Sequence, residues 1–73
     1  MTLAEIRPYQ DRTVILELAD GEITTATIVF VDAEYEDIVV DMISTNRQDN
    51  YRHAGAAYAI PLVALVSVQE VSS

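Results

Sequence analysis

Residues 13–32, TVILELADGEITTATIVFVD, decide the fold that the chain is expected to adopt. At the start of this stretch, hydrophobic residues occupy alternate positions, which is typical of a β-strand with one buried face. The residues on that face are Val14, Leu16 and Leu18. Asp20-Gly21 follows and favours a hairpin, because glycine adopts the positive φ that a tight turn requires. Residues 22–32 are rich in Thr, Ile and Val, which fit a pleated sheet. The pattern predicts a hairpin whose second strand bends around two sides of a barrel.

Outside this hairpin, the sequence indicates a short helix and three further strands. Thr2-Leu3-Ala4-Glu5 has the spacing of a capping box, and Pro8 lacks the amide proton that would continue the helix. The polar segment 44–56 is typical of a surface loop. The predicted elements of one domain, 1–73, are a helix at about 2–7 and strands at about 12–19, 22–32, 37–44, 57–61 and 65–71. We expect an all-β fold, a small, five-stranded, strongly bent barrel of the SH3 type.

The size of the chain favours self-assembly. A domain of 73 residues buries only roughly 60% of the surface that its unfolded chain exposes, and small domains commonly need further support. The sequence has no cysteine and one histidine, which excludes disulfides and thiolate metal sites, yet 51% of its residues are hydrophobic. The last two strands are apolar, with Glu70 as their one charge. We therefore predict a homo-oligomeric ring of about five to seven subunits, closed by pairing of these edges.

The charge of the chain argues against general binding of nucleic acid. Twelve acidic residues stand against four arginines and no lysine, which gives a net charge of −8. Cationic side chains supply nearly all non-specific affinity for phosphates, so the surface as a whole is not a phosphate binder. The first residues lack the apolar run of a signal peptide, and the apolar stretch 60–68 is shorter than the ~20 residues of a membrane helix. We expect a cytoplasmic protein that does not enter a membrane.

The hairpin and the acidic connection after it resemble the first motif of the Sm-like (LSm/Hfq-type) family. The positions that fit its spacing are Val14, Leu16, Leu18, Asp20, Gly21, Ala26, Ile28, Val31 and Asp32. Tyr35, Asp37 and the apolar run 38–40 complete the motif if one residue is inserted after Asp32. Residues 60–71 are similar to the closing strands of divergent members. The resemblance implies a bacterial- or phage-type Sm-like barrel that assembles into a ring and associates with RNA.

The resemblance also implies an RNA pocket at Asp32, Tyr35 and Asp37, although this pocket departs from the family pattern. In the family, a uridine-like base stacks on the aromatic position and is held by an Asn amide and an Arg-Gly turn. Tyr35 suits the stacking role, but Asp37 stands at the Asn position and only accepts hydrogen bonds when ionised. Residues 61–63, Pro-Leu-Val, replace the Arg-Gly turn. Glu34 and Glu36 would add to an acidic collar that repels phosphate.

Each candidate site has a structural alternative. Tyr35 would otherwise cover the barrel end or contact a neighbouring subunit. The acidic connection lacks the spacing of a calcium loop, so a solvated turn is favoured and no metal or other cofactor is expected. A basic and aromatic cluster consists of Arg47, Tyr51, Arg52 and His53. It would grip nucleic acid through phosphate contacts and stacking, or its arginines would pair with Asp49 or a neighbour's acids.

No residue set in the sequence supplies a nucleophile, a base and an orienting group, so an enzyme is not expected. The function that the resemblance implies is that of a non-enzymatic, ring-forming protein that binds RNA weakly. The alternative is an oligomeric ring scaffold or adaptor that binds protein or peptide and has lost the RNA pocket. Fold alone does not decide between the two.

Overall fold

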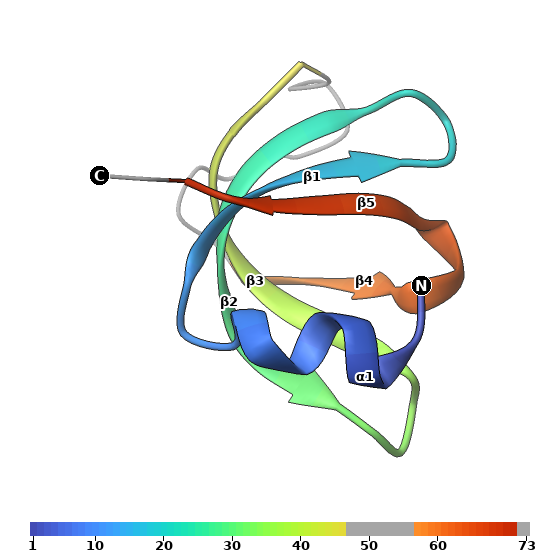
Figure 1. Cartoon of the computed structure of the whole chain (residues 1–73). Coiled ribbons are helices and arrows are strands. Elements are labelled where there is room, and N and C mark those ends of the chain that lie inside the picture. Colours follow the sequence, from blue (N-terminus) through green and yellow to red (C-terminus); the bar gives the residue numbers. More distant parts are fainter. Residues whose placement is uncertain (47–56, 72–73) are drawn as a thin grey trace.

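Five antiparallel strands form one sheet in the computed structural model, which describes residues 1–46 and 57–71 (Figure 1). The strands are β1 (Thr13–Leu18), β2 (Ile23–Asp32), β3 (Asp37–Thr45), β4 (Ala57–Pro61) and β5 (Leu65–Glu70). Their order in the sheet is β4-β3-β2-β1-β5, so β4 and β5 are its two edges. Figure 1 shows β2 and β3 curving strongly around the interior. The prediction of a small, strongly bent, five-stranded all-β barrel with a short N-terminal helix is confirmed.

The turn between β1 and β2 has the geometry that Asp20-Gly21 predicts. Gly21 has a φ of 92°, a region that costs little for glycine alone. Its amide donates to the carbonyl of Leu18 at 3.0 Å, and the amide of Glu22 donates to the Asp20 carboxylate at 3.0 Å. These bonds close the hairpin and set the register in which Val14 faces Ala26.

The pairing of β2 with β3 has two irregularities. Between Thr25 and Ala26 the extra residue is Ile43 of β3, and between Ile28 and Phe30 it is Val29 of β2. A residue that one strand adds to a pair bends that strand and increases its local twist. The first part of β2 also pairs with β1, as far as Thr27, while pairing with β3 continues to Asp32. One strand thereby serves two sides of the barrel, as its length predicts.

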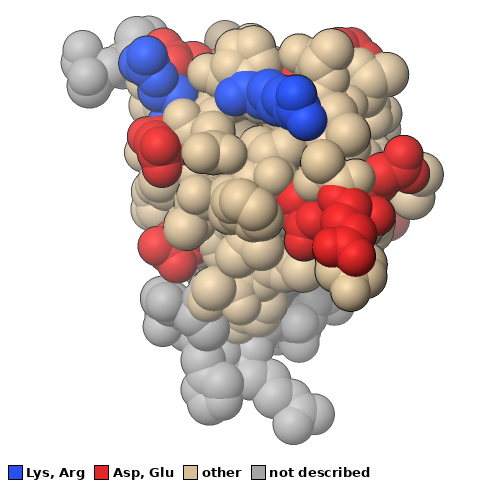
Figure 2. Space-filling model, turned by 90° about the horizontal axis from the view of Figure 1, so that it is seen from below, with Lys and Arg blue, Asp and Glu red and all other residues tan. Residues whose placement is uncertain are grey.

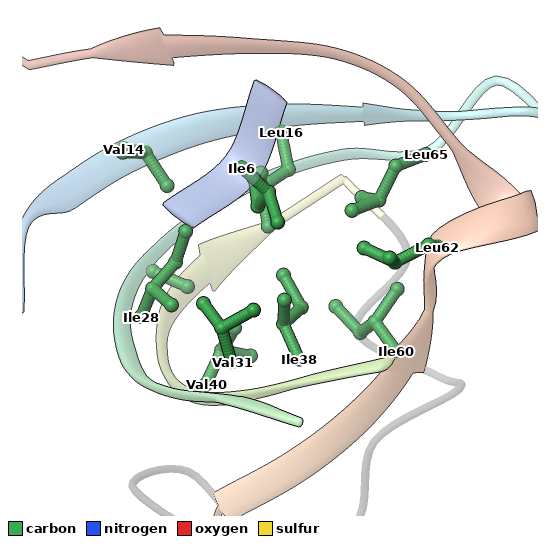
Figure 3. Packing of buried hydrophobic residues seen from close by; sticks show 11 residues of the cluster. Ile6, Val14, Leu16, Ile28, Val31, Ile38, Val40, Ile60, Leu62 and Leu65 are labelled. Carbon is green, nitrogen blue, oxygen red and sulfur yellow. The ribbon is translucent and has the colours of Figure 1, made fainter. Parts of the chain in front are cut away.

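The core lies inside this curve, where side chains from the strands, from α1 and from the turn after β4 meet (Figure 3). The predicted alternation holds, because Val14 and Leu16 are fully buried and Leu18 is half-buried. The buried hydrophobic residues are Ile6, Val14, Leu16, Ala26, Ile28, Val31, Ile38, Val40, Ile60, Leu62 and Leu65. At roughly 1.5–3 kcal/mol for each large aliphatic side chain, burial of this cluster is the main stabilising contribution to the fold.

The N-terminal helix is short, as the sequence predicts. α1 (Leu3–Ile6) starts from a capping box, in which the Glu5 amide donates to the Thr2 hydroxyl and the Thr2 amide donates to the Glu5 carboxylate at 3.0 Å. A 3-10 turn, η1 (Arg7–Tyr9), follows and contains Pro8. Ile6 is the α1 residue that enters the core. None of the helices in the described residues is long and apolar enough to span a membrane.

Several boundaries differ by about one residue from the predicted ones. α1 spans Leu3–Ile6 rather than 2–7, β1 spans Thr13–Leu18 rather than 12–19, and β2 begins at Ile23 rather than 22. β3 continues to Thr45, one residue beyond the predicted end at 44, because Thr24 and Thr45 pair across β2 and β3. β5 ends at Glu70. A 3-10 turn, η3 (Leu62–Ala64), joins β4 to β5 and matches the tight turn that Pro61 indicates.

Candidate functional site

Hydrogen bonds hold the acidic connection between β2 and β3 in a turn. The Asp32 carboxylate accepts hydrogen bonds from the amides of Glu34 at 3.0 Å and of Tyr35 at 3.3 Å. Glu36 has a φ of 52°, in the left-handed region that non-glycine residues seldom adopt. Its carbonyl accepts a hydrogen bond from the Leu62 amide at 2.9 Å. The turn is therefore fixed both by its own aspartate and by η3.

The three residues of the proposed RNA pocket lie together on this turn. Asp32 and Asp37 are directly opposite each other in the register of β2 and β3, and both are half-buried. Tyr35 is 72% exposed, so most of its side chain is open to solvent in the single chain. Asp37 is also opposite Pro61, which places the turn beside the segment 61–63. The arrangement offers one aromatic face and several carboxylates, with no cationic side chain on the turn itself.

The electrostatic character of this end is acidic. Figure 2, seen from below, shows acidic side chains gathered on the side where the β2–β3 turn lies in Figure 1. Among the described residues the arginines are Arg7 and Arg12, and Arg12 forms an ion pair with Glu70 at 3.7 Å.

No cluster of three or more His, Cys, Asp or Glu side chains in the described parts of the chain is arranged to hold a metal ion. The other predicted set, Arg47, Tyr51, Arg52 and His53, lies outside the described residues.

A buried carboxylate, which the sequence analysis missed, lies at the start of β2. Glu22 is only 2% exposed, and its Oε2 atom accepts hydrogen bonds from the hydroxyls of Thr24 at 2.9 Å and Thr45 at 2.6 Å. Beside it, the Asn46 side chain accepts from the Ile23 amide at 2.9 Å. These contacts join the hairpin turn to the end of β3. The signal was present in the sequence, because extending the inward alternation from Ile28 back along β2 reaches Glu22.

Within the described parts of the chain, the two edge strands show few of the features that usually protect an edge. β4 has β3 as its one neighbour, and β5 has β1. β4 carries no charged residue, and Glu70 of β5 is engaged by Arg12. Ala57, Ala59 and Val66 are exposed on these strands. Charges, prolines or covering segments normally blunt an exposed edge, and here Pro61 stands only at the end of β4.

No model of a known protein family, no curated protein and no solved structure matches the chain.

Proposed function

We propose that the chain is a non-catalytic, Sm-like subunit of a cytoplasmic homo-oligomeric ring, which acts as a scaffold or adaptor for protein. The observation that carries the proposal is the pair of edge strands at opposite ends of one sheet, β4 and β5, whose outer edges pair with no other described strand. Pairing β5 of one copy with β4 of the next uses each edge once. Repetition of this heterologous contact closes a ring of about five to seven subunits.

The composition of the two edges supports pairing between copies. β4 has five residues and β5 has six, so their lengths are nearly equal. β4 carries no charged residue and Glu70 of β5 pairs with Arg12, so no charge repulsion opposes pairing of the two edges. A 73-residue barrel also gains from burying further apolar surface against a neighbour, because its own core is small.

The acidic surface favours a protein partner over RNA. With the net charge of −8 repeated in every subunit, a ring would repel a phosphate backbone over most of its surface. RNA association remains the second candidate, because Tyr35 is exposed on a fixed turn and an exposed aromatic ring suits base stacking. Its site would be the pocket of Asp32, Tyr35 and Asp37, with Arg47, Tyr51, Arg52 and His53 as the alternative contact.

Changing one exposed edge residue tests the ring. The pairing of β5 with β1 skips Val66, which is exposed, so Val66→Lys adds a charge to the edge without disturbing that pairing. We expect the native chain to be a discrete oligomer by light scattering at micromolar concentration and Val66→Lys to dissociate it. Val63→Lys is the matched control, since Val63 is exposed on η3 and lies outside both edges. A folded native monomer, or equal dissociation by both variants, would contradict the proposal.

A further inference from the structure

An apolar row crosses the outer face of three strands. Phe30 of β2 is directly opposite Val39 of β3, which is opposite Ala59 of β4. Phe30 is 50% exposed and the adjacent Val29 is 43% exposed, while Ala59 is exposed and Val39 is half-buried. Directly opposed side chains in a sheet lie roughly 5 Å apart at Cβ, so these residues form one continuous surface. Val29, Phe30, Val39 and Ala59 make up this outer apolar row.

The row exists because of the bulge in β2 at Val29. In a regular strand, neighbouring residues point to opposite faces, so either Val29 or Phe30 would point into the core. Here Ile28 pairs with Val40 and Phe30 with Val39, which leaves Val29 without an opposite residue. A bulge redirects side chains in this way. Its result is two large consecutive apolar side chains in solvent beside a fully formed core.

Carboxylates border the row on both sides. Asp37 and Asp41 are two residues before and after Val39, so both share its outer face of β3. Asp32 is opposite Asp37 on β2, and Thr27 is opposite Asp41. The nearest described cation along the chain is Arg12, whose carbonyl accepts from the Ile28 amide at 3.0 Å. Its side chain, however, reaches Glu70.

We propose that the outer apolar row docks a segment of a partner protein in which apolar side chains are flanked by lysine or arginine. The apolar centre would pack on Phe30 and Val39, and the flanking cations would meet Asp37 and Asp41. This charge complementarity excludes a phosphate backbone. It also disfavours a second copy, which has the same net charge of −8 and no lysine. The inference rests on the proposed protein-binding role, but it does not require a closed ring.

Binding of two short peptides tests the inference. The probes are the fluorescently labelled peptides KKVFVKK and EEVFVEE, each with blocked ends, measured by anisotropy, with 15N-labelled protein for chemical-shift mapping. We expect the basic peptide to bind at about 0.05 M salt and to change the chemical shifts of the amides of the row. Its affinity should fall at higher salt, because the Debye screening length becomes shorter. The acidic peptide should bind at least about tenfold more weakly, because the same flanking positions would repel it.

Three variants locate the contact. Phe30→Ser should weaken the basic peptide about tenfold by removing the aromatic contact. Asp41→Asn, a nearly isosteric change at an exposed site, should weaken it about threefold. Glu17→Gln removes the same charge from the outer face of β1 and should leave the affinity unchanged. Far-ultraviolet circular dichroism checks that each variant is folded.

The inference is overturned if neither peptide binds, if both bind equally, if Asp41→Asn and Glu17→Gln behave alike, or if the shifts lie away from the row. Shifts of the row caused by oligo-uridine would equally overturn the choice of partner. Light scattering of the same samples separates this result from the ring proposal. An intact ring that ignores the basic peptide refutes the docking site alone, and a monomer that binds it refutes the ring alone.

Discussion

Three described residues in the left-handed backbone region lie at turns of the barrel. Gly21 has a φ of 92° between β1 and β2, Glu36 has 52° between β2 and β3, and Asp11 has 66° before β1. The Asp11 amide donates to the Ile28 carbonyl at 2.6 Å, which fastens the chain to β2 at that point. Glycine adopts such angles without strain, whereas other residues pay a steric cost. The surrounding structure must therefore hold the two non-glycine residues, Asp11 and Glu36, in this conformation.

Substitution of Gly21 by valine should lower the free energy of unfolding by about 2 kcal/mol, because a β-branched side chain is a strong outlier at this φ. Urea denaturation followed by circular dichroism measures the change. Ala19→Val is the matched control, since Ala19 is exposed in the same turn region and has no positive φ. Equal midpoints for the two variants would show that Gly21 does not need its left-handed conformation.

At the scale of elements, the capping box makes α1 sensitive to acid. The backbone amide of Thr2, and then its hydroxyl, donate to the Glu5 carboxylate and hold the pKa of Glu5 below its ordinary value of 4.5. A lowered pKa means that folding favours the ionised form. This contribution to stability is complete above pH 4.5 and is lost as the pH falls through the lower pKa of the folded state.

Glu5→Ala should therefore destabilise the chain at neutral pH, and the difference from the native chain should shrink as the pH falls through that range. Thermal denaturation at a series of pH values gives the comparison. Ala4→Gly weakens the same helix without removing a titratable group, so its effect should not follow this trend. A destabilisation by Glu5→Ala that stays constant down to the lowest pH would show that the ionised carboxylate does not contribute.

The elements were predictable where a local signal specifies them. Asp20-Gly21 specifies a turn by its backbone needs, and the alternation of Val14 and Leu16 specifies a buried face. The bulge in β2 was not predictable. Val29 has no opposite residue in β3, but the β-branched and aromatic residues around it give no signal that marks this position. The exposure of Val29 and Phe30 follows from that bulge and was missed with it. The burial of Glu22 was missed because a carboxylate at the mouth of a barrel resembles a turn residue.

The shared position of the three residues proposed for an RNA pocket was predictable, whereas their use stays a prediction. The sequence placed Asp32, Tyr35 and Asp37 on one connection, and the structure brings them together. Whether an acidic turn with an exposed tyrosine binds a base depends on donors that would have to come from elsewhere, either from the segment 47–53 or from a neighbouring copy. Neither contribution follows from the pattern of a single chain.

At the scale of the whole molecule, charge should dominate any contact with RNA. We expect weak binding of oligo-uridine at physiological salt, without preference over oligo-adenosine, because Asp37 offers no donor and the surrounding carboxylates repel phosphate. Asp37→Asn should restore only part of the affinity. Residual binding should fall steeply with salt and disappear when both Arg47 and Arg52 become alanine. Fluorescence anisotropy on the native chain and on each variant measures each case.

The decisive comparison uses Tyr35→Ala. If the native chain binds oligo-uridine tightly and selectively, and this binding survives the double arginine change but is lost in Tyr35→Ala, the pocket is functional. That outcome would make RNA, rather than protein, the partner of the acidic end.

The order of the strands also sets a sequence of events for folding. β1, β2 and β3 are neighbours both along the chain and in the sheet, so they pair through short loops. β5 is different, because its one sheet neighbour is β1, and Leu16 meets Val68 from near the other end of the chain. Bringing such distant segments together carries a larger loss of chain entropy and slows folding. We expect β5 to join last, so that a newly made chain exposes β1 as a temporary edge, at which strand exchange between copies competes with completion of the barrel.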